Sequence, residues 1–242
     1  MVILMKSSIQ DAISVFLAEL LGTGMITFAG CMSCVPWKET PSNFEVAIAF
    51  GLVIMMIILI FGSVSGAHLN PAVTVAACIF KSITFKMSLL YILAQFLGGF
   101  LGYGLLKLAT PEPIFVSNIC VTSPAPEISL FQALLIEFCM TTILLLVCCG
   151  VWDPRSAKNT DSIPLKFGFT VAALSIIGGP YTGCSMNPAR TLGPAIWNQD
   201  LSTFWIYLSA PMTAAIVIPI IYKVIFYREL PSQKSGEASM SA

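Results

Sequence analysis

Charge is scarce in this sequence. Only 10% of its 242 residues are Asp, Glu, Lys or Arg, whereas soluble domains carry about 25%. Acidic and basic residues balance at 12 each, so no excess of positive charge suggests nucleic-acid binding. A single histidine, isolated acids and dispersed cysteines offer no nucleophile–base arrangement. We therefore expect a membrane protein that is not an enzyme, with no cofactor and no bound metal.

Long apolar segments take the place of charge. About 20 helical residues are needed to cross about 30 Å of hydrocarbon, and six segments come near that length. They run approximately over Ile13–Cys34, Phe44–Gly62, Met87–Leu108, Leu130–Gly150, Leu165–Gly179 and Thr203–Phe226. The fifth is short, and we expect its helix to extend at one end. The sequence predicts one all-α membrane domain over residues 1–242, with a polar tail at 231–242.

Lysine and arginine predict the orientation of the six spans. An even number of crossings places both termini on one side, where nine basic residues gather. These are Lys6, Lys81, Lys86, Arg155, Lys158, Lys166, Lys223, Arg228 and Lys234. The opposite side holds Lys38 and Lys107. Because positive residues concentrate on the cytoplasmic side of membranes, we expect both termini in the cytoplasm.

The two halves of the chain repeat each other. Asn70, Pro71 and Ala72 are matched 117 positions later by Asn187, Pro188 and Ala189. Glu19 and Glu137 each precede a threonine by four residues. Three spans per half is an odd number, so the second copy enters the membrane from the opposite side. The copies cover about 11–110 and 128–228, and such inverted repeats place their working site at the midplane.

Each Asn-Pro-Ala motif opens a short apolar segment, Pro71–Phe80 or Pro188–Trp197. Ten helical residues reach about 15 Å, or half of the hydrocarbon layer. Asn is favoured at the N-cap of a helix and Pro at its first position. Two half-helices should therefore meet N-terminus to N-terminus at the midplane. Their partial positive charges repel cations, and the Asn amides can donate to an oxygen, which favours a neutral solute over an ion.

The motifs "SGAHLNPAVT" and "TGCSMNPART", with six spans and repeated acids, make the sequence resemble the aquaporin/major intrinsic protein family over nearly its whole length. The resemblance implies six tilted transmembrane helices plus two re-entrant half-helices, one pore per subunit and a homotetramer in the lipid bilayer. We expect the plasma membrane. The resemblance also implies that Glu19 and Glu137 hold the loop backbones and that His68 is a hydrogen-bonded structural residue. A proton relay through the acids and pH gating by the histidine are the alternatives.

The family's selectivity filter falls by position on Phe50, Ser175, Cys184 and Arg190. Water-selective relatives usually carry histidine at the place of Ser175, so a serine should widen the constriction. Thr191 and Ala195, in contrast, are typical of water channels. A water-channel framework with a small residue in the filter is similar to the insect entomoglyceroporins.

The resemblance thus implies a passive channel for water, glycerol and urea that excludes protons and ions. A strictly water-selective channel is the nearest alternative. An ion-coupled secondary transporter also uses inverted repeats and broken helices, but Glu19 and Glu137 are its only candidate coupling acids. A structural junction protein with a vestigial pore would not need the intact Asn70, Asn187 and Arg190.

The eight cysteines suggest neither a disulfide framework nor a zinc site. Cys31 and Cys34 have the spacing of a redox or zinc pair, but no second pair follows. We expect both to be small apolar residues near the outer end of the first span. Cys184 is the exception, because the resemblance places it in the pore wall.

Overall fold

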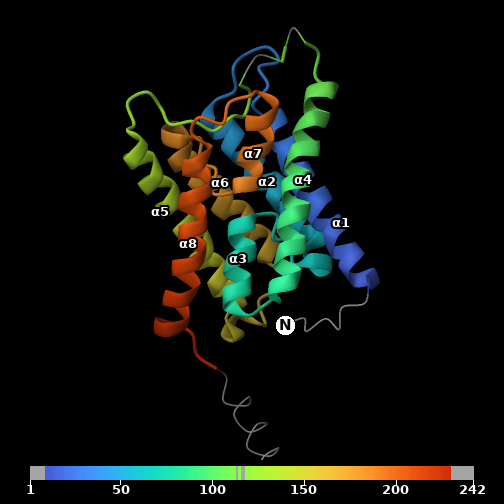
Figure 1. The fold of residues 1–242 in the computed structure, drawn as a ribbon, viewed down its shortest axis with the longest axis vertical. Coiled ribbons are helices and arrows are strands. Elements are labelled where there is room, and N and C mark those ends of the chain that lie inside the picture. Colours follow the sequence, from blue (N-terminus) through green and yellow to red (C-terminus); the bar gives the residue numbers. More distant parts are fainter. Residues whose placement is uncertain (1–8, 113, 116–117, 230–242) are drawn as a thin grey trace, which may run out of the picture.

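A computed structural model describes residues 9–112, 114–115 and 118–229 of the chain, and these residues form a helical bundle (Figure 1). The α-helices are α1 (Ile9–Met25), α2 (Asn43–Ser65), α3 (Pro71–Phe80), α4 (Phe85–Ala109), α5 (Leu130–Trp152), α6 (Ile163–Thr182), α7 (Pro188–Trp197) and α8 (Phe204–Ile225). A π-helical segment over Ile26–Gly30 continues α1, and a short 3₁₀ turn over Pro154–Ser156 follows α5. Lys6, Lys234 and the predicted tail at 231–242 lie outside the described residues.

Six of the described helices are long and apolar enough to cross a membrane. They are α1 with its π-helical extension, α2, α4, α5, α6 and α8. Large apolar side chains that are at least half exposed occur on every one of them, including Ile13, Leu59, Leu101, Leu135, Phe169 and Ile216. So many exposed large apolar side chains on every long helix are unusual for a soluble monomer, but they suit contact with lipid. The predicted all-α membrane fold is confirmed.

The ends of the spans differ from those predicted. The first span begins at Ile9 and ends at Gly30, four residues earlier at each end than the apolar run. The fifth span, α6, extends beyond its apolar run at both ends. The expectation that it would extend at only one end was wrong. Pro164 lies in its first turn and Gly183, at φ +75°, ends it in the left-handed conformation. Proline at the start and glycine at the end, and not hydropathy, therefore fix the boundaries of α6.

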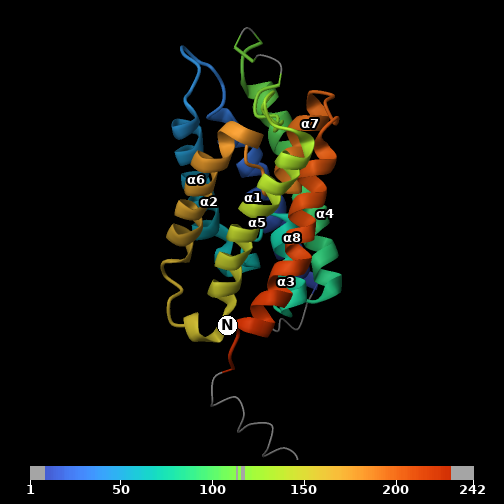
Figure 2. The ribbon, with the colours of Figure 1, turned by 90° about the vertical axis from the view of Figure 1, so that its left-hand side faces the viewer.

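The two halves pack in matching pairs. Helix α1 lies against α4 as α5 lies against α8, and α7 contacts α4 as α3 contacts α8 (Figures 1 and 2). Helices α2 and α6, which are counterparts in the repeat, pack directly on each other. A Cβ atom on either Gly51 or Gly168 would meet the carbonyl oxygen of the other glycine. These two glycines therefore allow the backbones of α2 and α6 to approach closely.

Glycines also set the packing of α4 on α1. A Cβ atom on Gly98 would meet the carbonyl oxygen of Leu20, and one on Gly102 would meet that of Gly24. The small residues at this contact hold the two long helices together without side chains between them. The half-helix α3 lies in the lower half of the bundle and the half-helix α7 in the upper half (Figure 1).

Candidate pore and constriction

The half-helices begin directly after asparagines that cap them. Asn70 Oδ1 accepts a hydrogen bond from the backbone N–H of Ala72 at 2.8 Å. Asn187 Oδ1 accepts one from Ala189 at 3.0 Å. Both asparagines have extended backbone, and a proline follows each at the first helical position. The predicted bounds of the two half-helices are confirmed, as is their capping.

The same asparagines join the two half-helices to each other. Asn70 Nδ2 donates to the carbonyl oxygen of Met186, and Asn187 Nδ2 donates to that of Leu69, both at 2.8 Å. The N-termini of α3 and α7 therefore meet inside the bundle. A carboxamide nitrogen carries two hydrogens, so each side chain has a second N–H beyond this contact. Both asparagines line a large cavity, where that N–H can donate to a solute oxygen.

The backbone before each half-helix has the same unusual shape. Three residues of each loop have positive φ, at positions that differ by 117. These are Gly66 (+79°), Ala67 (+47°) and Leu69 (+57°), matched by Gly183 (+75°), Cys184 (+43°) and Met186 (+53°). Such conformations cost about 1–3 kcal/mol each for residues other than glycine, and they persist only where the surroundings hold them.

Glu19 holds the first of these loops. Its carboxylate is fully buried and accepts hydrogen bonds from the backbone N–H groups of His68 at 2.9 Å and Leu69 at 2.6 Å. The Ser65 hydroxyl donates to it at 2.6 Å and Gln95 Nε2 at 2.8 Å. A buried carboxylate is tolerated when hydrogen-bond donors surround it. The sequence reasoning missed Gln95. Its position as a polar residue inside the apolar run of α4 was the signal that could have identified it.

Glu137 holds the second loop in the same way. It is fully buried and accepts from the backbone N–H groups of Ser185 and Met186, both at 2.9 Å, and from the Thr182 hydroxyl at 2.7 Å. Each of these donors stands 117 positions after a donor to Glu19. The two acids thus support the two loops in equivalent fashion, and Thr182 is a further residue that the sequence reasoning missed.

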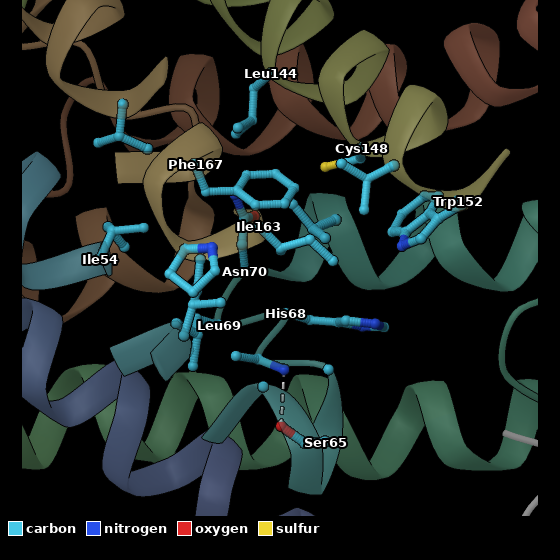
Figure 3. A pocket seen from close by; sticks show the side chains of 18 of the residues that line it. Ile54, Ser65, His68, Leu69, Asn70, Leu144, Cys148, Trp152, Ile163 and Phe167 are labelled. Carbon is cyan, nitrogen blue, oxygen red and sulfur yellow. Dashed lines mark hydrogen bonds between the residues drawn. The ribbon is translucent and has the colours of Figure 1, made fainter. Parts of the chain in front are cut away.

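His68 lies in the wall of the large cavity. Its Nδ1 is 3.3 Å from the Thr74 hydroxyl, and its ring centroid is 4.8 Å from that of Tyr91 and 6.2 Å from that of Trp152. Figure 3 shows the ring beside Trp152 at the edge of the cavity. The half-buried ring therefore has both a hydrogen-bond partner and aromatic neighbours.

Two cavities adjoin inside the bundle, of about 1100 Å³ and 240 Å³. Apolar side chains of α5 and α6, including Leu144 and Phe167, face the loop residues Leu69 and Asn70 across the larger one (Figure 3). Four residues line both cavities, and they are the four predicted filter residues: Phe50, Ser175, Cys184 and Arg190. The structure brings these side chains together at the neck between the cavities.

Arg190 is the charged member of this neck. Its side chain is 8% exposed, and Nη1 donates to the carbonyl oxygen of Cys120 at 2.8 Å. Its Nη2 lies 3.3 Å from Cys120 Sγ, and the guanidinium centre is 5.1 Å from the centroid of the Phe50 ring. A Cβ atom on Gly30 would collide with that ring, so the glycine leaves room for Phe50 in the neck.

The cysteine expectation is corrected at this point. Cys31 forms a disulfide with Cys120, which is 89 residues away in the loop between α4 and α5. Cys31 is therefore not simply a small apolar residue, and the search for a nearby second pair could not find so distant a partner. Cys34 is a free thiol that lines the smaller cavity. Within the described part of the chain, no group of three His, Cys, Asp or Glu side chains could hold a metal ion.

Comparison with known proteins identifies the family. A model of the major intrinsic protein family matches residues 6–222. The chain belongs to this family. This major intrinsic protein is 37% identical to "Aquaporin-2" of Bos taurus over 212 residues, which are 87% of the chain and 78% of that relative. It is 37% identical to "Nodulin-26" of Glycine max over 227 residues, which are 92% and 81%.

Comparison with solved structures supports the same family. The aquaglyceroporin from Plasmodium falciparum superposes with a TM-score of 0.74 at 27% identity, covering 88% of the chain and 96% of that structure. This major intrinsic protein is therefore a multi-pass membrane channel of the aquaporin type and not an enzyme. The similarity to the insect entomoglyceroporins stays a prediction.

Mercury is expected to block this channel through Cys184. The Cys184 thiol lies in the neck, where it donates to the carbonyl oxygen of Leu174 at 3.2 Å. A metal ion bound there would fill the narrow passage. Mercuric chloride should abolish most of the protein-dependent osmotic water flow in liposomes, and a small monothiol added only in proportion to the metal, too little to reduce a disulfide, should restore it.

Two variants separate the candidate thiols in that test. Cys184→Ser should be resistant to mercury, whereas Cys34→Ser should remain sensitive, because Cys34 lines only the smaller cavity and not the neck. Equal block of Cys184→Ser and the wild type would show that another thiol, such as Cys148 in the wall of the larger cavity, is responsible.

Proposed function

We propose that this chain forms a passive channel for water and glycerol, and for urea, that excludes protons and ions. The observation that carries the proposal is Ser175 in the neck with Phe50, Cys184 and Arg190. A serine leaves the width that a histidine ring would occupy and still offers one donor and two acceptors. Phe50 gives an apolar wall for the carbons of glycerol, while Arg190 gives N–H donors for its hydroxyls.

Exclusion of charge rests on two fixed sources of positive potential. The N-termini of α3 and α7 meet where Asn70 and Asn187 join the two loops by hydrogen bonds. Helix N-termini carry partial positive charge. Arg190 adds a full charge in the neck. Together they repel cations and hydronium, while a neutral solute passes by exchanging hydrogen bonds.

Coupling to an ion gradient receives no support from the buried acids. Each carboxylate of Glu19 and Glu137 accepts at least three hydrogen bonds from its own loop region. An acid that carries protons or cations must exchange partners during transport, whereas these two hold strained loops in place. Passive permeation is therefore the proposed mode.

The proposed setting is the plasma membrane, with cytoplasmic termini and four subunits, each with its own pore. Helix α1 begins and α8 ends at the same end of the bundle (Figure 1). The Cys31–Cys120 disulfide ties the loop between α4 and α5, which lies at the opposite end, to the end of the first span (Figure 1). Disulfides persist in oxidising compartments outside the cytoplasm. Its position supports the orientation that the basic residues predict.

Purified protein in liposomes tests the proposal. In a sucrose gradient the vesicles should shrink much faster than protein-free vesicles. A trapped pH indicator should report no proton entry above that of protein-free vesicles when a pH gradient and a potassium–valinomycin potential are applied. A protein-dependent proton current at neutral pH would refute charge exclusion, and solute uptake that needs an ion gradient would favour a coupled transporter.

A further inference from the structure

Arg190 owes its position in the neck to an acceptor outside the two half-helix loops. Two of its guanidinium nitrogens contact Cys120, one through the backbone carbonyl at 2.8 Å and one through the sulfur at 3.3 Å. Among the described residues Arg190 makes no ion pair. The one ion pair in that part of the chain joins Arg155 to Asp153. A neutral, directional contact therefore decides where this buried charge lies.

Cys120 belongs to the long connection between α4 and α5, which has no helix of its own in its described residues. Its φ is +62° and that of Asn118 is +63°, which is uncommon for residues other than glycine. Nearby, the Tyr103 hydroxyl donates to the carbonyl oxygen of Ile119 at 2.6 Å. The disulfide then ties Cys120 itself to Cys31, a fully buried residue directly after the π-helical segment.

We propose that the Cys31–Cys120 disulfide is a positioning element for Arg190. By fixing where the guanidinium lies, the disulfide sets the permeability of the neck. The inference rests on the proposed function of Arg190 as the charged filter residue. The carbonyl of Cys120 stays in place because its own side chain is anchored covalently to the first span. Cys31 and Cys120 are thereby positioning residues, whose effect on the neck passes through Arg190.

Loss of the cross-link should narrow the passage. A buried guanidinium has five N–H donors that need acceptors. When Cys120 is free to move away, those donors must find other partners. Because Arg190 lines both cavities, a turn away from Cys120 carries the guanidinium across the neck. Water permeability should then fall, and it should recover when the disulfide re-forms.

The test is reduction of the folded channel in liposomes with dithiothreitol. Oxidation of its two thiols to a cyclic disulfide supplies the two electrons and two protons that convert the bond into two cysteine thiols. Cys120 lines the smaller cavity, so the reagent can reach it. Thiol labelling counts the two new thiols, and circular dichroism verifies that the helices remain. Osmotic water permeability should fall about threefold or more and return after reoxidation.

Variants then show whether the effect passes through Arg190. Cys31→Ser and Cys120→Ser should have the low permeability from the start and should not respond to reduction, while Cys34→Ser should behave like the wild type. In Arg190→Val, reduction should leave permeability unchanged. Complete reduction of the wild type without a change in water flow would overturn the inference, as would an equal proportional loss in Arg190→Val. Water flow is the readout, so a channel that fails to conduct glycerol would refute the proposed solute range without affecting this test.

Discussion

Replacement of Ser175 by histidine is expected to lower glycerol permeability by about tenfold or more while water permeability changes by less than about twofold. Glycerol is wider than water and must shed its hydration to enter the neck. It needs the width that serine leaves and hydrogen bonds that replace those lost to solvent. An unpaired polar group costs about 1–3 kcal/mol, and 1.36 kcal/mol is a factor of ten in rate. Light scattering in sucrose and then in glycerol measures both permeabilities.

A second substitution at the same position separates width from hydrogen bonding. Ser175→Ala keeps the neck open but removes the hydroxyl, so its glycerol permeability should lie between those of the wild type and Ser175→His. Equal glycerol permeability in the wild type and Ser175→His would mean that Ser175 does not determine solute selection.

Replacement of Arg190 by valine is expected to let protons or cations leak while water flow is retained. The change removes the full positive charge of the neck together with the bulk of the guanidinium, which contacts Cys120 and Phe50. The half-helix N-termini alone then oppose cations with partial charges of about half a unit each. A trapped pH indicator should report proton entry several-fold above that of the wild type.

Arg190→Lys is the matched control for the charge. Lysine keeps the positive charge but not the planar fork of five donors, so this variant should remain tighter to protons than Arg190→Val. An ion-tight Arg190→Val with unchanged conductance would contradict the assignment of Arg190 to charge exclusion.

Local signals made the centre of the fold predictable from the sequence. An asparagine that caps a helix and a proline in its first position act within three or four residues, so the bounds of α3 and α7 could be predicted correctly. The 117-residue repeat likewise related Glu19 to Glu137, and the structure has both acids accepting equivalent hydrogen bonds. Hydropathy was less exact about the ends of α1 and α6, and for α6 the reason is that Pro164 and Gly183, and not apolarity, mark its ends.

Contacts between distant residues were not predictable in the same way. Cys31 and Cys120 are 89 residues apart, and Arg190 is 70 residues from the carbonyl that it contacts. No spacing rule links such positions, because the loop that brings them together has no periodicity. Gln95, which joins Glu19 to Thr74, was missed for a different reason. One amide in a long apolar run gives little signal unless intramembrane polar residues are sought deliberately.

Glycerol uptake by liposomes that contain the wild-type protein tests the central claim most directly. Vesicles mixed with hypertonic glycerol first shrink as water leaves and then reswell as glycerol enters. A channel for both solutes should shrink and reswell much faster than protein-free vesicles, with no ion gradient and no saturation of the glycerol rate at high concentration. Rapid shrinkage followed by reswelling no faster than that of protein-free vesicles would contradict the account and identify a strictly water-selective channel.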